Sequence, residues 1–302
     1  MAVTIDSSWP TAATLIKEAP LDGRPHVALF GVSTYATSVS PRSSTSTPQA
    51  VRAALEKYST WSFRDRVDLA DHVVLVDHGD VEDPDGEGGH ERVAEALASA
   101  PPTAALRIIL GGDNAATWHA LSALANDRAQ EYGLITLDAH LDMRHGRSNG
   151  SPVRQLLDEG LDPRHVVQVG LGDFSNSAAF ARETLERGVH VIERDAFFDE
   201  DATTVARRAL ELAGHDGRPI YVDVDLDCAD RAAVPGCPAA APGGLSAAEV
   251  RAFVREVCSD ESVVAIDFTE VDVERDSPDQ RTVRLVALLI LEALAGVARR
   301  NS

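Results

Sequence analysis

Eight short apolar runs, rich in β-branched residues, recur along the chain and alternate with segments of helical spacing. The runs cover residues 26–32, 72–79, 106–112, 133–139, 165–172, 189–194, 220–227 and 263–271. Strands that alternate with helices predict a mainly parallel sheet with helices on both faces, so we expect an α/β fold. We see no second core, internal repeat or linker, and therefore expect residues 1–302 to form a single domain.

The charge balance excludes two classes of partner. Lys and Arg number 28 against 48 Asp and Glu, which gives a formal net charge of −20. Such a surface repels phosphate backbones and anionic membranes, so we expect neither nucleic-acid nor membrane binding. The apolar run 285–298 contains Glu292 and is too short to span a bilayer, which predicts a buried helix.

The N-terminal residues and the cysteines indicate where the protein works. Residues 1–20 lack the basic start and apolar core of a secretory signal. The three cysteines are odd in number and form no CxxC pair, which is typical of a reducing compartment. We therefore expect a cytoplasmic protein.

Polar and acidic side chains collect where four of the predicted strands end. They are Asp113 and Asn114; Asp138, His140 and Asp142; Asp223, Asp225 and Asp227; and Asp267, Glu270 and Asp272. The carboxyl ends of parallel strands share one edge of an open sheet, and ligands bind there. The four groups are therefore expected to lie near one another.

This concentration of carboxylates predicts a metal centre. Residues two apart on an extended chain project to the same side, so Asp223, Asp225 and Asp227 are predicted to line one face. Two carboxylates ~4 Å apart repel by about 4 kcal/mol at an effective dielectric constant near 20. A cation is the simplest remedy, and oxygen ligands with one imidazole suit Mn²⁺ or a similar divalent ion. His140 alone would more often be a structural histidine, but the combined pattern favours a ligand.

These motifs resemble those of the ureohydrolases, the family of arginases, agmatinases, guanidinobutyrases and formimidoylglutamases. The family motifs GGDH, DAHxD and SxDxDxxDP correspond here to residues 111–114, 138–142 and 223–230, and the late family glutamate corresponds to Glu270. The resemblance covers about residues 25–297. It implies an arginase-like three-layer αβα sandwich, about eight strands, a homo-oligomer and two Mn²⁺ ions per subunit.

The resemblance also implies roles for individual residues. Asp138 and Asp225 match carboxylates that bridge the two ions, while His140 and Asp227 match ligands of one ion. Asp142 matches a ligand of the other ion that also accepts a hydrogen bond from the attacking hydroxide. Asp142 and Glu270 are the expected catalytic residues, because Glu270 is placed to bind the amidine of the substrate.

Four positions depart from the family pattern: Asp223 replaces the usual Ser, Arg231 replaces the Pro that ends the third motif, and Asn114 and Asn149 replace histidines. Asn114 stands where the family has a histidine ligand, and an amide oxygen is the weaker ligand, so we expect a weakened metal site on that side. Asn149 stands where arginases carry a second active-site histidine, which disfavours an arginase. His119 and His145 lie nearby in sequence and could compensate, although His119 is expected to pack within a helix.

A basic segment after the metal motif discriminates between substrates. Residues 143–154 contain Arg144, His145, Arg147 and Arg154 but no acid. Arginine is suited to bidentate carboxylate binding, and N-formimidoyl-L-glutamate carries two carboxylates. The alternative is that each arginine pairs with a surface acid. The predicted substrate-binding residues are Arg144, His145, Asn149, Arg154 and Glu270.

The expected reaction is hydrolysis of N-formimidoyl-L-glutamate to L-glutamate and formamide, a step of histidine degradation in this family. We find no motif for an organic cofactor. One alternative is a guanidine hydrolase of the same family acting on guanidinobutyrate, agmatine or arginine. Another is a non-catalytic metal-binding or metabolite-sensing protein. Residues 32–49, rich in Ser and Thr, are either a solvated loop or a substrate lid.

Overall fold

The computed structural model describes residues 8–18, 23–40, 46–214 and 216–300. In this part of the chain nine strands form one sheet, and every neighbouring pair of strands is parallel. In spatial order they are β1 (Ile16–Lys17), β5 (Val74–Asp80), β2 (His26–Val32), β6 (Leu106–Gly111), β11 (Val263–Thr269), β10 (Ile220–Asp225), β7 (Gly133–Leu137), β8 (Val166–Leu171) and β9 (His190–Glu193). The predicted parallel sheet is confirmed, and all eight predicted strands belong to it.

Three short strands were not predicted. The edge strand β1 adds a ninth member to the sheet, and β3 (Trp61–Ser62) pairs antiparallel with β4 (Val67–Asp68) in a separate hairpin. Each of the three is two residues long. Two residues carry no periodic pattern, so the sequence offers no signal for them.

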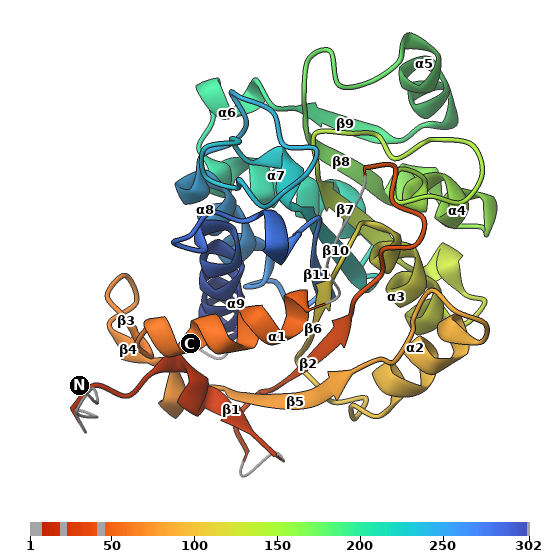
Figure 1. Cartoon of the computed structure of the whole chain (residues 1–302). Helices are drawn as coiled ribbons and strands as arrows, with labels where there is room; N and C mark the ends of the chain where they lie inside the picture. The colour runs from red at the N-terminus through yellow and green to blue at the C-terminus, as the bar shows by residue number, and fades with distance from the viewer. Residues whose placement is uncertain (1–7, 19–22, 41–45, 215, 301–302) are drawn as a thin grey trace.

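Helices cover both faces of the sheet, which confirms the three-layer αβα architecture (Figure 1). One layer contains α1 (Thr47–Ala54), α7 (Ala202–Gly214), α8 (Ala247–Val257) and α9 (Arg281–Arg299). The other contains α2 (Gly89–Ala98), α3 (Ala115–Ala125) and α4 (Pro152–Asp158). Of the two remaining helices, α5 (Ala178–Arg187) follows β8 and α6 (Ala196–Asp199) follows β9, and both lie near the β9 edge of the sheet in Figure 1.

The helix α9 is the predicted buried C-terminal helix. Most of its side chains, including that of Glu292, are inaccessible to solvent. The Glu292 carboxylate is tolerated in this apolar layer because it forms ion pairs with Arg251 and Arg255 of the neighbouring α8. Within the described residues, no helix has the length and apolar content that crossing a bilayer requires.

The strand order explains how the acidic groups converge. The strands β6, β11, β10 and β7 are consecutive in the middle of the sheet. They are the strands whose carboxyl ends lead into Asn114, Glu270, Asp227 and Asp138. The predicted convergence of these groups at one edge therefore follows from the topology.

Candidate metal centre and active site

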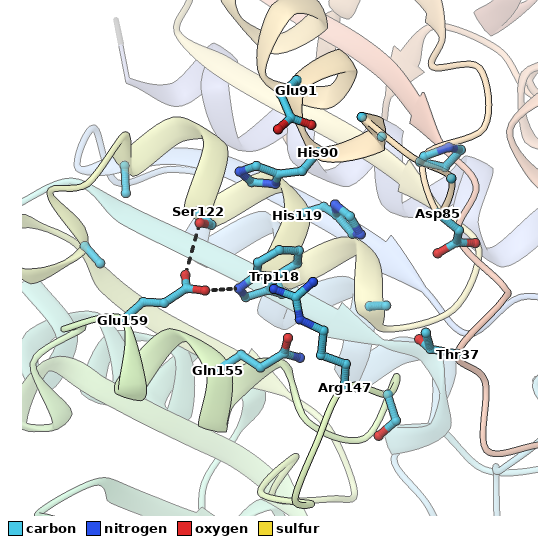
Figure 2. Close-up of a pocket in the computed structure, with 18 of the residues that line it drawn as sticks. Thr37, Asp85, His90, Glu91, Trp118, His119, Ser122, Arg147, Gln155 and Glu159 are labelled. Atoms are coloured by element: carbon cyan, nitrogen blue, oxygen red, sulfur yellow. Dashed lines mark hydrogen bonds between the residues drawn. The ribbon is translucent and has the colours of Figure 1, made fainter.

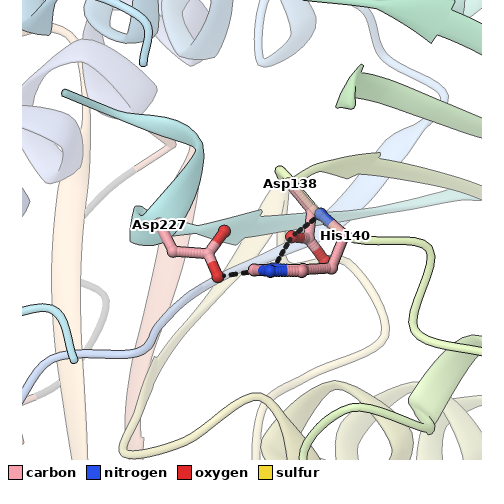
Figure 3. Close-up of side chains that lie close together, drawn as sticks. All are labelled: Asp138, His140 and Asp227. Carbon is pink, nitrogen blue, oxygen red and sulfur yellow. Dashed lines mark hydrogen bonds and ion pairs between the residues drawn. The ribbon is translucent and has the colours of Figure 1, made fainter. Parts of the chain in front are cut away.

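Three of the predicted ligands form a compact cluster. The ring of His140 lies between two carboxylates, with its Nδ1 atom 2.8 Å from Asp227 and 3.5 Å from Asp138 (Figure 3). One ligand atom from each of the three residues lies within 4.8 Å of the others. The other oxygen of Asp138, Oδ2, is buried and accepts no hydrogen bond from the described residues. A buried carboxylate oxygen without a donor is the kind of group that a cation satisfies.

Tight turns rather than extended strands bring the carboxylates together. The strand β10 ends at Asp225, and Asp227 lies in a turn of 3₁₀ helix, where its backbone N–H donates to Asp225 Oδ1 over 2.8 Å. The prediction that Asp227 continues the face of an extended strand was therefore wrong. The same type of side-chain hydrogen bond follows β7, where the His140 N–H donates to Asp138 Oδ1 over 2.7 Å.

The two predicted catalytic residues have unusual backbone conformations. Asp142 has φ = 51° and Glu270 has φ = 59°, both in the left-handed region that non-glycine residues seldom occupy. Such a conformation costs on the order of 1–3 kcal/mol and is found preferentially at functional sites. Both residues lie beside the predicted cation site. The strain therefore agrees with the catalytic roles that the sequence predicts for them.

Two hydrogen bonds fix the carboxylate of Glu270 beside the cavity. Its Oε1 atom accepts from the backbone N–H of Asn114 over 3.0 Å and from the Asn149 amide over 2.8 Å. The other end of the Asn149 amide accepts from the backbone N–H of Val39 over 2.8 Å. Asn149 thus joins Glu270 to the predicted lid segment, of which residues 41–45 lie outside the described residues.

The buried acids carry strongly shifted pKa values. Burial, together with the charges of Asp142 and Asp227, raises the pKa of Asp138 well above its usual range. Burial and the charge of Asp227 do the same for Asp225. Burial raises the pKa of Asp142 to about 7, although the charge of His140 opposes that rise. Without a cation this cluster holds protons at neutral pH.

Burial alone would lower the pKa of His140, but the ion pair with Asp227 raises it. Burial lowers the pKa of the imidazole, whereas the hydrogen bond to Asp227 and its charge raise that pKa to about 9. The imidazole is therefore expected to carry a proton at neutral pH when no cation is bound. Oxygen ligands, one imidazole and an excess of negative charge fit Mn²⁺ and similar divalent ions.

Asn114 does not present its amide oxygen to this cluster. The amide nitrogen points to Asp142 and donates to its Oδ2 over 2.6 Å. The amide oxygen faces the other way and accepts from the hydroxyls of Thr117 and Thr269. These hydrogen bonds describe the amide beside carboxylates that hold no cation, so the role of Asn114 as a metal ligand stays a prediction.

A cavity of about 300 Å³ lies beside the carboxylates. Of the predicted substrate-binding residues, Arg144, Asn149 and Glu270 line it. Its lining also contains residues that the sequence did not suggest: Ser175, Asn176, Ser177 and Phe180. Asn176 also contacts the segment that follows Asp138, because its Oδ1 atom accepts from the Leu141 N–H over 2.8 Å. The only sequence signal was that this polar run follows a predicted strand.

Two predicted substrate-binding residues lie elsewhere. Arg154 is buried, its Nε donates to the Met143 carbonyl, and its two terminal nitrogens form a bidentate ion pair with Glu183 at 2.8 and 2.6 Å. With those donors engaged, Arg154 is a structural residue, and the prediction that it binds substrate was wrong. His145 is exposed and contacts Phe180 edge-on, outside the residues that line the cavity.

We expect replacement of Arg154 with Leu to reduce stability and leave substrate binding unchanged. Loss of the three hydrogen bonds should lower the free energy of unfolding by about 1–2 kcal/mol, because Glu183 is partly exposed and keeps its ion pair with Arg187. Chemical denaturation and steady-state kinetics measure the two effects, with the exposed Arg164→Leu as control. A tenfold rise in KM without loss of stability would return Arg154 to the substrate site.

A second, larger cavity of about 660 Å³ contains the remaining basic and histidine candidates (Figure 2). The guanidinium of Arg147 lies 4.8 Å from the centre of the Trp118 ring, and His119 packs against the same indole. Burial, with a smaller contribution from His90, lowers the pKa of His119 to about 4. The interpretation of His119 as a packed helical residue is confirmed, and it does not line the cavity beside the carboxylates.

Comparison with known proteins identifies the family. The sequence profile of the Arginase family matches residues 25–296. The chain belongs to the arginase family. Formimidoylglutamase from Bacillus subtilis strain 168 is 32% identical over 283 residues, which cover 89% of this chain and 86% of that protein. This result confirms the family predicted from the sequence motifs.

Solved structures of the arginase family share the fold. The crystal structure of formimidoylglutamase from Bacillus subtilis has a TM-score of 0.87 at 29% identity and covers 98% of this chain and 94% of that one. A Trypanosoma cruzi formiminoglutamase crystallised with Mn²⁺ also has a TM-score of 0.87, at 22% identity, covering 97% and 99%. At that level of identity the second likeness supports the fold alone.

Proposed function

We propose that this arginase-family protein hydrolyses N-formimidoyl-L-glutamate to L-glutamate and formamide. The observation that carries the proposal is a cluster of buried carboxylates and one imidazole beside a cavity that also contains the cation Arg144. Similarity to formimidoylglutamases over most of the chain supports the choice of substrate. That the protein is a cytoplasmic homo-oligomer stays a prediction.

Five residues would hold a pair of Mn²⁺ ions. In our proposal the carboxylates of Asp138, Asp142, Asp225 and Asp227 and the imidazole of His140 would hold them. The raised pKa values and the donor-free oxygen of Asp138 support such a site. When bound, the two ions supply a water activated near neutral pH and a Lewis acid.

The protein side chains perform the remaining chemistry. The Glu270 carboxylate, oriented by Asn149, binds the cationic amidine and places its carbon toward the carboxylate cluster. Asp142 accepts the proton that the attacking water loses, because its carboxylate lines the cavity beside the other carboxylates of the cluster. The bond between the formimidoyl carbon and the glutamate nitrogen then breaks. The proton held by Asp142 passes to that nitrogen and the remaining hydroxyl proton follows, so the products are neutral formamide and the ammonium group of glutamate.

Arg144 and two serines are suited to the glutamate part of the substrate. Arg144 is exposed and lines the cavity, so its guanidinium is available for bidentate binding of one carboxylate. The hydroxyls of Ser175 and Ser177 line the same cavity and offer neutral donors to the other. An agmatinase substrate carries no carboxylate and would use neither group.

A substrate panel tests the proposal. The purified protein, loaded with Mn²⁺, is assayed with formimidoylglutamate, guanidinobutyrate, agmatine and arginine, and both formamide and urea are measured. We expect formamide from formimidoylglutamate at the highest kcat/KM. Urea from arginine without turnover of formimidoylglutamate would refute the substrate. Tightly bound Mn²⁺ with no turnover of any amidine would instead support a non-catalytic protein.

Arg144→Ala should raise KM for formimidoylglutamate by about 10–100-fold and change kcat little. The loss of a charge-assisted bidentate hydrogen bond corresponds to about 1.5–3 kcal/mol, and the bond is present before and during the reaction. Steady-state kinetics measure the effect. Arg164→Ala serves as control because its exposed guanidinium pairs with Asp162, away from the cavity. An unchanged KM would remove Arg144 from the substrate site.

A further inference from the structure

Part of the active cavity is formed by a segment that has no regular secondary structure. The strand β2 ends at Val32 and α1 begins at Thr47, and the described residues between them form only turns and irregular backbone. Val39 and Ser40 of this connection nevertheless line the cavity beside the carboxylates. Because no helix or strand fixes residues 34–40, which we call the cavity-wall segment, their position depends on contacts with other parts of the chain.

Hydrogen bonds hold the cavity-wall segment near both of its ends. At its start, the Asp113 N–H donates to the Thr34 carbonyl over 2.8 Å, and the Thr34 hydroxyl donates to the Asp113 carbonyl over 3.0 Å. Further along, the Ser38 hydroxyl donates to Asp113 Oδ2 over 2.5 Å. Near its end, the Val39 N–H donates to the Asn149 amide oxygen over 2.8 Å. These contacts leave residues 35 and 36 to be held by a different group.

The carboxylate of Asp85 holds the middle of the segment. Its Oδ2 atom accepts from the backbone N–H of Tyr35 over 2.6 Å and from that of Ala36 over 2.9 Å. Hydrogen bonds to an ionised acceptor are stronger than neutral ones. Asp85 belongs to the acidic loop between β5 and α2 and lines the second cavity, not the active cavity (Figure 2). Any effect of Asp85 on the reaction therefore passes through the cavity-wall segment.

One side-chain amide connects this segment to Glu270. The Asn149 oxygen accepts from the Val39 N–H, and the Asn149 nitrogen donates to Glu270 Oε1 over 2.8 Å. Only the oxygen of an amide accepts and only its nitrogen donates, so a single orientation satisfies both contacts. A shift of Val39 would remove the donor that fixes the Asn149 amide, and the Glu270 carboxylate would lose a fixed partner.

We propose that Asp85 is a positioning residue for the active cavity. By holding residues 35 and 36, it keeps the Val39 N–H in place to orient Asn149 and, through it, Glu270. This role rests on the proposed function, because Glu270 is the residue that binds the amidine there. The alternative is that Asp85 only stabilises a surface turn. The two differ in what happens at Val39, and in catalysis, when the Asp85 carboxylate is removed.

Hydrogen exchange measures the first difference without an activity assay. Exchange of the Tyr35, Ala36 and Val39 amides is followed by mass spectrometry in the Mn²⁺-loaded parent protein and in Asp85→Ala. Tyr35 and Ala36 lose their acceptor, so faster exchange there is expected from either role. The proposal also requires the Val39 amide to exchange at least about fivefold faster, because its protection reports local opening of the segment. Unchanged exchange at Val39 overturns the proposal.

Steady-state kinetics measure the second difference. We expect Asp85→Ala to lower kcat/KM for formimidoylglutamate by about 10-fold, because a small displacement of a positioned group slows a reaction from a distance. Asp85→Asn keeps an acceptor oxygen for the two amides and should restore most of the activity. Glu87→Ala is the matched control, because it removes an exposed carboxylate from the same loop that forms no hydrogen bond with the described residues. An Asp85→Ala protein with the kcat/KM of the parent contradicts the proposal.

A double-mutant cycle separates positioning through Asn149 from general loss of stability. Asn149→Ala removes the connection between Val39 and Glu270. In that background we expect Asp85→Ala to change kcat/KM by less than about twofold, whereas independent effects would multiply. Fully multiplicative effects overturn the proposed path. If the parent protein hydrolyses no amidine, the proposed function fails, and hydrogen exchange at Val39 still decides the role of Asp85.

Discussion

Metal-free protein is expected to lose thermal stability as the pH rises from about 4 to 7, and Mn²⁺ is expected to abolish that loss. Burial raises the pKa of Asp142 from an ordinary 3.8 to about 7, and the pKa values of Asp138 and Asp225 rise in the same direction. An acid whose pKa is higher in the folded state stabilises the fold below its unfolded pKa. That contribution is lost as the pH rises through the folded pKa.

The expected effect is large. A shift of that size at Asp142 corresponds to about 4 kcal/mol, or a fall in melting temperature of roughly 10 °C in a chain of this length. His140 acts in the same direction at higher pH, because its pKa is raised to about 9 in the fold. Surface acids with lowered pKa values have the opposite effect, because their contribution to stability increases as the pH rises. The pKa values of Asp162 and Glu183 are lowered to about 2, so this increase takes place below pH 4.

Scanning calorimetry of chelator-treated and Mn²⁺-loaded protein at a series of pH values measures both curves. Bound cations replace the protons on the carboxylates, so the loaded protein should show a flat or rising melting temperature over the same interval. Asp142→Asn in the metal-free protein removes one titrating group and should flatten part of the slope. A metal-free melting temperature that rises with pH would show that these acids are not buried together.

Asp225→Asn is expected to abolish turnover while stabilising the metal-free protein. The amide keeps the oxygen that accepts from the Asp227 N–H, and it is neutral without the proton that the buried Asp225 carboxylate must take up on folding. At pH 8 the metal-free variant should therefore melt at a higher temperature than the parent protein. With a predicted bridging ligand neutralised, we expect kcat to fall by at least about 10³-fold, equivalent to ~4 kcal/mol.

The readouts are metal per subunit by mass spectrometry, kcat and the melting temperature of both forms. Asp230→Asn is the matched control from the same motif. The Asp230 carboxylate accepts from the backbone N–H groups of Ala232 and Gly243 and lies outside the carboxylate cluster. We expect the control to retain metal and turnover. An Asp225→Asn protein that binds two ions and turns over normally would refute the proposed role of Asp225 as a metal ligand.

Local sequence patterns were sufficient to predict most strands of the sheet. The strands that the structure contains in residues 26–32 and 263–269 were predicted because each is a run of apolar and β-branched residues between helical segments. The strand β1 and the hairpin of β3 and β4 escaped prediction because two residues define no period. The metal cluster was predictable for a related reason, since carboxyl ends of parallel strands must meet at one edge.

The partners of individual polar side chains were not predictable. Arg154 and Arg144 look alike in the sequence, yet Arg154 pairs with Glu183 in α5, 29 residues later, whereas Arg144 lines the cavity. Asn149 was expected near the substrate, but its hydrogen bond to Glu270 connects positions 121 residues apart. No local pattern specifies such pairs.

The sequence alone determined the layers of the fold, the family and the edge where acids gather, because periodicity and motif spacing act over a few residues. Only the tertiary structure decided which arginine faces the cavity, how turns at Asp138 and Asp225 bring the ligands together, and which atom of Asn114 faces Asp142. The physical reason is that a buried hydrogen bond depends on donors supplied by distant strands and helices, and those meet only after the sheet has formed.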